Sequence, residues 1–409
     1  MTEYEAGDTV FEDEPYAAIV SATSLDSVCS FCFKNYVEYR CSLCNRLSYC
    51  TEGCQQADVF HDRVECIALA DQDKIVEDEV RLVIRTAARY KHEQQRNYAS
   101  LGNFFGLERG LDDLVSHLED LNDDERQKVK AKAQQIKSIL DRVGVSIERK
   151  ELMEIYMKCK INCHLVIDHN EPEYLSRGRA IYLAASKLDH TCVPTENYTL
   201  MFDGRRLVIR AMKNFTLKDP SDLRIHYVPS NLSYNDRRDR LLKNYFFLCS
   251  CDQCVSQLRF PAADDDSREE RVSEIAEVLR QYDPDSWSWF DTATKVLQKF
   301  EGVTDRDFHL HWLLLHTQQA AAHQKLYSRS LEYGTRALKG ATTVMGFQRI
   351  LFGLLSCAKH LGWNKRDSAY IDNFTGIKRI SEKLFTITHG KDHSIVKMIS
   401  ESRPVEQSR

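Results

Sequence analysis

What this sequence lacks excludes several classes of protein. It has no run of about 18 consecutive apolar residues, the length that a membrane-spanning helix needs, so we expect no membrane span. Its formal net charge is −5, which leaves no basic surplus for neutralising phosphates, so we do not expect a protein that coats nucleic acid. The acidic N-terminal residues, MTEYEAGDTVFEDEP, contain no apolar segment, so we expect no signal peptide.

Cysteine, by contrast, is plentiful. The chain has 14 cysteines among 409 residues, with 43% hydrophobic and 29% charged residues, a composition typical of two or three folded domains. A chain that stays inside the cell keeps its thiols reduced, so clustered cysteines favour a metal over disulfides. Three cysteines stand outside any cluster and are expected to be small core residues: Cys159, Cys163 and Cys357.

The other eleven cysteines form two zinc-ligand patterns, because thiolates two or three residues apart can share one tetrahedral Zn²⁺. The first pattern is Cys29-x2-Cys32, Cys41-x2-Cys44, Cys50-x3-Cys54, His61 and Cys66. The second is Cys249, Cys251 and Cys254, with Cys192 as the expected fourth ligand; a three-cysteine knuckle without Cys192 is the alternative. The block 29–66 is too polar to fold by apolar burial alone, so metal binding would supply its folding free energy. A RING module would end in a second Cys-x2-Cys, whereas this block ends in a lone Cys66.

Hydrophobic patterning divides the rest of the chain. Residues 10–20 predict two short strands joined by a turn at Pro15, and residues 70–160 predict helices. Residues 198–210 predict a hairpin that turns at Asp203-Gly204, followed by a strand at 223–227 and a helix at 237–245. The acidic stretch 261–270 predicts a linker, and residues 270–400 predict helices with small residues that allow close packing, a pattern similar to paired-helix repeats.

Four further segments, taken in order with the first cysteine pattern, resemble one family, the SET- and MYND-domain lysine methyltransferases. The segment 188–194 (LDHTCVP) is similar to the Asn-His-Ser-Cys-x-Pro-Asn signature, and 223–227 (LRIHY) to the strand that ends in the catalytic tyrosine. The segment 245–254 (YFFLCSCDQC) resembles the post-SET zinc loop, and 388–394 (THGKDHS) resembles a stretch of the last helices. The block 29–66 resembles a MYND finger.

This resemblance implies an α+β fold, a SET-type β core with an inserted MYND finger and helical insert, a post-SET zinc loop and a C-terminal TPR-like helical domain. The expected boundaries are 1–26 for the N-terminal strands, 27–68 for the finger, 69–155 for the insert, 156–229 for the SET core, 230–258 for the post-SET region and 270–409 for the helical domain.

The resemblance also implies three structural zinc ions. The finger would bind two of them in interleaved sets, the first held by Cys29, Cys32, Cys50 and Cys54, and the second by Cys41, Cys44, His61 and Cys66. The third would be closed by Cys192, Cys249, Cys251 and Cys254. His61 stands one residue earlier than the family spacing, where Asp62 occupies the expected position and is the alternative ligand.

The implied reaction is transfer of a methyl group from S-adenosylmethionine to a protein lysine, on histone or non-histone substrates. An aromatic channel would desolvate the lysine amine and orient its lone pair towards the methyl group. Tyr227 and Tyr245 are the candidate residues of this channel. Tyr227 alone on an apolar strand would be read as a core residue, but it precedes Cys249 by 22 residues. The candidate cofactor-binding residues are Asn162, Tyr182, Asp189, His190, Tyr227 and Phe247.

Three departures from the family pattern, the finger histidine among them, leave a second hypothesis open. The glycine-rich turn that the family has ahead of Gly7 is missing here, so we expect a late start or a cofactor pocket open on that side. Asp189 and Thr195 replace the signature asparagines, and a carboxylate cannot donate a hydrogen bond. The alternative is therefore a degenerate scaffold whose finger binds proline-containing peptides. In either case we expect a monomer in the cytoplasm and nucleus.

Overall fold

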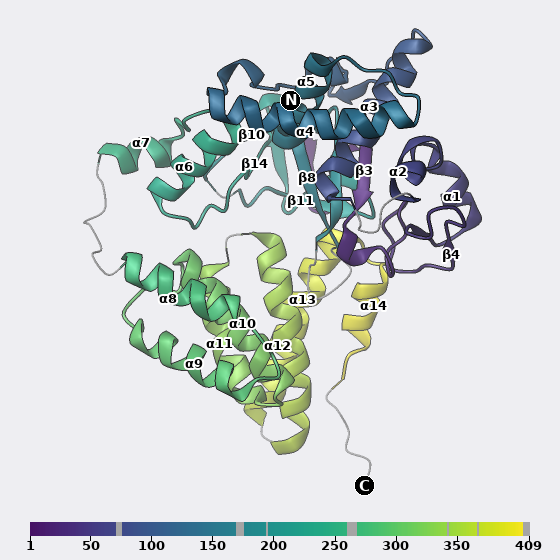
Figure 1. Cartoon of the computed structure of the whole chain (residues 1–409). Coiled ribbons are helices and arrows are strands. Elements are labelled where there is room, and N and C mark those ends of the chain that lie inside the picture. Colours follow the sequence, from purple (N-terminus) through teal and green to yellow (C-terminus); the bar gives the residue numbers. More distant parts are fainter. Residues whose placement is uncertain are drawn as a thin grey trace.

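The computed structural model describes residues 1–70, 76–168, 176–193, 195–259, 268–341, 343–365 and 368–403. Figure 1 shows two parts. Strands with the helices that cover them form one part, and a bundle of C-terminal helices forms the other, with α13 and α14 reaching back to the strands. The small cysteine-rich finger lies at one side of the strand-containing part (Figure 1). Within the described ranges, no helix is both long and apolar enough to cross a bilayer.

The β core consists of short sheets. In one, β12 (Arg206–Ala211) lies between β11 (Tyr198–Asp203) and β2 (Thr9–Asp13), and all pairs are antiparallel. In another, β9 (Ser176–Ile181) lies between β3 (Ala17–Val20) and β8 (Cys163–Ile167), again antiparallel. The strands predicted on either side of Pro15 are therefore confirmed as β2 and β3.

Two further pairs complete the core. β1 (Thr2–Tyr4) pairs with β13 (Phe215–Leu217), and β10 (Asp189–His190) runs parallel to β14 (Arg224–Ile225). The strand expected over 223–227 is thus only two residues long. The predicted hairpin turn is confirmed, because β11 and β12 turn at Asp203-Gly204 and Gly204 has φ of +60°. Glycine adopts that left-handed conformation without steric cost.

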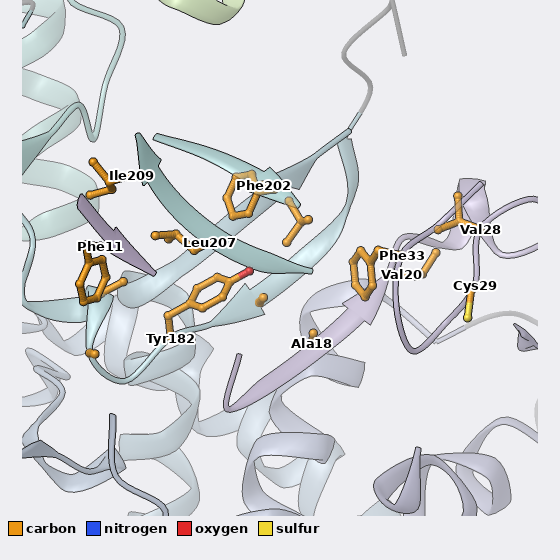
Figure 2. Close-up of a cluster of buried hydrophobic side chains, with 14 of the residues drawn as sticks. Phe11, Ala18, Val20, Val28, Cys29, Phe33, Tyr182, Phe202, Leu207 and Ile209 are labelled. Carbon is orange, nitrogen blue, oxygen red and sulfur yellow. The ribbon is translucent and has the colours of Figure 1, made fainter. Parts of the chain in front are cut away.

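The finger shares the hydrophobic core of the sheets. It contains β4 (Tyr39–Arg40), β5 (Ser48–Tyr49), α1 (Glu52–Ala57), a π-helical turn (His61–Glu65) and α2 (Cys66–Ala70). Figure 2 shows Phe33 of the finger beside Val20 of β3, within one cluster of buried side chains that extends to Tyr182, Leu207 and Phe202. The metal-dependent finger is therefore packed onto the β core and is not a free appendage.

The helices predicted over residues 70–160 are confirmed, with one addition. They include α3 (Asp78–Gln95), α4 (Asp123–Arg142) and α5 (Arg149–Asn162). A hairpin interrupts them, formed by β6 (Gly102–Phe104) and β7 (Leu107–Arg109). Its turn is Phe105-Gly106, with φ of +50° and +92°, the left-handed pair that tight hairpins require. The helical prediction missed this hairpin because its strands of three residues are too short to show a period of two.

Helices make up the rest of the chain. α6 (Tyr234–Tyr245) and α7 (Asp252–Arg259) flank the second cysteine cluster. The C-terminal part comprises α8 (Arg268–Arg280), α9 (Trp287–Lys299), α10 (Phe308–His323), α11 (Tyr327–Gly340), α12 (Val344–Lys365), α13 (Ser368–His389) and α14 (Ser394–Glu401). Each helix from α10 to α13 packs against the next, as the paired-helix pattern predicts. Most of the predicted linker, 260–267, lies outside the described residues.

Candidate functional site

Twelve predicted zinc ligands gather into three groups of four. The groups are Cys29, Cys32, Cys50 and Cys54; Cys41, Cys44, His61 and Cys66; and Cys192, Cys249, Cys251 and Cys254. Within each group the ligand atoms lie within 4.8 Å of one another. The sets are those expected from the sequence, including the interleaving of the two finger sites.

The sulfur geometry fits zinc. Cys32 Sγ lies 3.5 Å from Cys50 Sγ, and Cys192 Sγ lies 3.8 Å from Cys249 Sγ. Four sulfurs at a tetrahedral Zn–S distance of about 2.3 Å stand about 3.8 Å apart, whereas a disulfide would need about 2.05 Å. All 14 cysteines are free thiols. The chain therefore carries three Cys/His zinc-binding clusters, each with four protein ligands and no position left for a catalytic water.

A buried ionic network holds the second finger cluster against the β core. Cys44 Sγ lies 3.6 Å from His61 Nε2, and the other ring nitrogen, Nδ1, lies 3.3 Å from Glu65. Glu65 is fully buried and accepts hydrogen bonds from Arg81 Nε and Arg85 Nε, both at 2.7 Å. A carboxylate on the second nitrogen fixes the tautomer and orientation of a zinc-bound histidine. His61 is therefore positioned as the fourth ligand of this cluster. The side chain of the alternative ligand, Asp62, lies outside the described residues.

The same two arginines also connect the finger to the β core. Arg85 pairs with both carboxylate oxygens of Asp58, at 2.8 and 2.9 Å, and Arg81 donates to the carbonyl of Val20 on β3 at 2.7 Å. Burial alone would raise the pKa of Glu65, but Arg85 and Arg81 hold that pKa well below its usual value. Sequence reasoning missed this network. Its only sequence signal is a glutamate four residues after the histidine.

The third cluster is tied to the candidate active site through a histidine. His190 Nε2 lies 3.1 Å from Cys192 Sγ, and His190 Nδ1 accepts the backbone N–H of Tyr227 at 3.1 Å. Because Nδ1 accepts, the proton sits on Nε2 and points to the sulfur. Burial, helped by His226 and nearby arginines, lowers the pKa of His190 to about 4, so the imidazole is neutral.

A cavity of about 1000 Å³ lies next to this histidine, between the β core and the C-terminal helices. The candidate residues Asn162, Tyr227 and Tyr245 line it together. The tyrosine rings are 4.8 Å apart, and His190 and Phe247 pack on Tyr227 at 5.3 and 6.3 Å between ring centroids. Asn162, Tyr227 and Tyr245 therefore form part of the cavity wall, whereas His190 and Phe247 pack on Tyr227 and are not part of the described lining.

Both tyrosine hydroxyls are anchored to the backbone. Tyr227 Oη donates to the carbonyl of Leu188 at 2.6 Å, and Tyr245 Oη donates to the carbonyl of Tyr227 at 3.3 Å. Burial raises the pKa of each phenol, so both stay protonated at neutral pH. With its proton committed to a carbonyl, each oxygen keeps lone pairs that can accept a hydrogen bond.

Of two further predicted cofactor residues, Asn162 lies in the cavity wall and Asp189 lies outside it. Asn162 Nδ2 donates to the carbonyls of Lys158 and Val115, at 2.8 and 3.0 Å, which fixes the side chain at the end of α5. Asp189 is exposed on β10, paired in register with Arg224 of β14, and is not part of the cavity lining.

Two sequence predictions are corrected. Tyr182 is fully buried, and Figure 2 shows its ring among Phe11, Leu207 and Phe202. Its hydroxyl donates to the backbone carbonyl of Arg205. It supports the cavity from behind and cannot touch a cofactor directly. Cys163, expected in the core, is only half-buried and lines the cavity.

The opposite wall of the cavity was not predicted at all. It comes from the C-terminal helices, through Leu338 and Lys339 of α11, Val344 and Phe347 of α12, and Arg306 just before α10. His164 of β8 was also missed, although it lines the cavity two residues after Asn162. No local sequence signal marks these residues, because long-range packing brings them to the site.

Comparisons with known proteins agree with this organisation. The MYND finger family model matches residues 29–66. Histone-lysine N-methyltransferase ASHR1 of Arabidopsis thaliana is 28% identical over 62% of the chain, which spans only about half (51%) of that relative. Similarity to histone-lysine N-methyltransferase Smyd1 of Mus musculus, at 22% identity, covers 98% of the chain and 85% of the relative. For SMYD3 of Homo sapiens, at 24% identity, the shares are 97% and 91%.

The finger match, the three Cys/His clusters and the nearly full-length similarity agree on one family. The chain is therefore similar, over nearly its whole length, to SET- and MYND-domain proteins that are named lysine methyltransferases, and it contains a MYND finger.

Proposed function

We propose that this protein is an S-adenosylmethionine-dependent protein-lysine N-methyltransferase. The observation that carries the proposal is the pair of half-buried tyrosines, Tyr227 and Tyr245, which line a large cavity, with Tyr227 held through His190 by a zinc-binding cluster. Methyl transfer to an amine requires the protein to remove water from the amine and to fix its approach to the methyl group. A channel lined by two tyrosines can do both.

The residues present fit the cofactor. Small-molecule sites are cavities of about 300 to 1,000 Å³ with a few placed polar groups, and this cavity has the required volume with the Asn162 amide in its wall. Asn162 would contact S-adenosylmethionine in this cavity, and His190 and Phe247, which pack on Tyr227, would support the wall against which it binds. When bound, that cofactor supplies an electrophilic methyl group on a positively charged sulfur.

The two tyrosines act on the lysine. Surrounding the amine with their rings removes its water, which disfavours the charged ammonium and leaves the nitrogen lone pair free to attack. The oxygens of Tyr227 and Tyr245 can accept the amine hydrogens, because their own protons are committed to the Leu188 and Tyr227 carbonyls. Once methylated, the nitrogen is cationic, and the electron-rich ring faces stabilise it.

His190 serves as a positioning residue for this channel. Its neutral ring joins the Tyr227 backbone to the Cys192 sulfur, so closing the third zinc site also fixes the segment after β14 that bears Tyr227. A neutral imidazole adds no positive charge beside a cationic cofactor or product, and the lowered pKa of His190, about 4, keeps it neutral.

Substrate and location are part of the proposal. Two of the relatives aligned nearly end to end carry names that specify histone lysines, and we propose a histone or non-histone protein lysine as the acceptor here. Such a protein would act as a monomer in the cytoplasm and nucleus.

Calorimetric titration of S-adenosylmethionine into zinc-replete protein tests the proposal, with Tyr227→Phe and His190→Ala as the paired variants. We expect micromolar binding that survives Tyr227→Phe and is lost in His190→Ala, because only the second variant releases the wall from the zinc cluster. Absence of binding to the wild-type chain would overturn the proposal and leave a scaffold role as the better account.

A further inference from the structure

The charges around the cavity are strongly unequal. Among the residues that the structure describes, its lining contains three cationic side chains, those of Arg224, Arg306 and Lys339, and one carboxylate, Glu196. That carboxylate is already engaged, because Lys213 Nζ lies 3.2 Å from its oxygen. The whole chain has a net charge of −5, so this cationic surplus is a local feature and not a consequence of a basic protein.

The three cations are available to a ligand. All three are exposed, and within the described ranges their side chains make no hydrogen bond or ion pair with another residue. They come from both walls. Arg224 lies on β14, three residues before Tyr227, whereas Arg306 and Lys339 stand on the C-terminal helical side. A segment that enters between the walls would therefore meet positive charge from both of them.

The rest of the lining accepts apolar groups. Leu165 and Leu200 contribute from the β core, while Val344 and Phe347 contribute from α12. Phe347 is 39% exposed, so its ring remains accessible to an apolar group in the cavity. The cavity thus combines apolar walls with unpaired cations, and charge complementarity then decides which peptides can enter.

We propose that the cavity selects lysines in acidic surroundings, that is, protein segments with Asp or Glu flanking the methylated lysine, over the Arg- and Lys-rich segments typical of basic tails. This inference rests on the proposed methyltransferase function and specifies its substrate class. Basic flanks would place like charges against Arg224, Arg306 and Lys339 with only the engaged Glu196 to offset them, whereas acidic flanks pair with all three.

The test uses three peptides of equal length with one central lysine, flanked by glutamate, glutamine or arginine. Zinc-replete full-length protein is assayed for kcat/KM with labelled S-adenosylmethionine, and for peptide affinity by fluorescence anisotropy. At ~50 mM salt we expect a preference of about tenfold or more for acidic over arginine flanks, shrinking towards equality near 500 mM salt as screening grows. The double variant Arg306→Glu/Lys339→Glu should invert the preference when the peptides are compared at saturating cofactor.

Lys295→Glu is the control, since Lys295 is 71% exposed on α9 and is not part of the cavity lining. It should keep the acidic preference. Equal use of the three peptides, or a preference for arginine flanks, would overturn the inference while leaving methyl transfer established. If no peptide is methylated, the proposed function fails; the anisotropy ranking then decides the charge preference of the cavity on its own.

Discussion

Replacing Glu65 with glutamine should weaken both the fold and the second finger zinc site. The Glu65 carboxylate is fully buried. It accepts hydrogen bonds from Arg81 Nε and Arg85 Nε, both at 2.7 Å, and it lies 3.3 Å from His61 Nδ1. Glutamine keeps the shape but loses the charge, and its amide group would turn an N–H₂ towards an arginine donor or towards His61. The contact that orients the zinc ligand is thereby damaged.

The expected loss of stability depends on which contacts Arg81 and Arg85 keep in the variant. Removing one partner of a buried ion pair costs about 3–5 kcal/mol. Arg85 would retain the bidentate pair with Asp58, but Arg81 would keep only a 3.4 Å contact with Asp78 and the Val20 carbonyl. We therefore expect about 3 kcal/mol of lost stability, at the lower end of that range. Loss of an outer-shell carboxylate typically weakens metal binding about 10- to 100-fold.

Two assays measure these effects on zinc-replete protein. Chemical denaturation gives the change in unfolding free energy, and competition with a chromogenic chelator gives the affinity of the most easily released zinc. The matched control is Glu277→Gln, which removes an exposed pair with Arg280 and should change stability by no more than about 1 kcal/mol. If Glu65→Gln matched that control in both assays, the reasoning about the buried network would be refuted.

Three further predictions concern the zinc loop, the hairpin turn and a buried carboxyl group. Cys251→Ala should lower the zinc content from three to two per chain and abolish cofactor binding, whereas Cys357→Ala should keep three, as atomic absorption would register. Gly204→Ala should cost about 2 kcal/mol or more in unfolding free energy, because φ is +60° and the new Cβ would stand 2.5 Å from a finger carbonyl; Gly106→Ala, with φ of +92° and open space, should cost about 1 kcal/mol. Burial raises the pKa of Asp13 to about 6, so its contribution to stability is present below the unfolded pKa of about 3.9 and is lost as pH rises through 6. Asp13→Asn should therefore gain stability over the wild type from pH 5 to pH 8, reaching about 1–3 kcal/mol, and a pH-independent difference in denaturation midpoints would contradict this.

The zinc ligands could be predicted from sequence because their signal is local. The spacing of a pair such as Cys29 and Cys32 is enough to show that both can bind one metal ion. The order of the pairs along the chain determines how the two zinc sites interleave. The turn at Asp203-Gly204 is local for the same reason. The C-terminal helices follow from periodicity, and Gly334 shows why small residues matter there: a Cβ would stand 2.7 Å from both Gln318 and Leu354 on the flanking helices.

The cavity could be predicted only in part, because its walls meet through long-range packing. Family resemblance located Asn162, Tyr227 and Tyr245, which share the cavity lining, but it gave no information on Lys339 or Phe347. Tyr182 was misplaced because its position near the signature segment does not reveal the direction of its side chain. In a strand, a shift of one residue moves a side chain to the other face.

The central claim is that Tyr227 and its surroundings transfer a methyl group to a protein lysine. The measurement that tests it most directly is the transfer of labelled methyl from S-adenosylmethionine to lysine peptides by zinc-replete protein, with wild type and Tyr227→Phe compared at matched cofactor occupancy. The account predicts transfer by the wild type and a loss of about 100-fold in Tyr227→Phe, because the amine loses an oxygen that orients it. Wild-type protein that binds the cofactor but never transfers methyl, or a Tyr227→Phe variant as active as wild type, would contradict it.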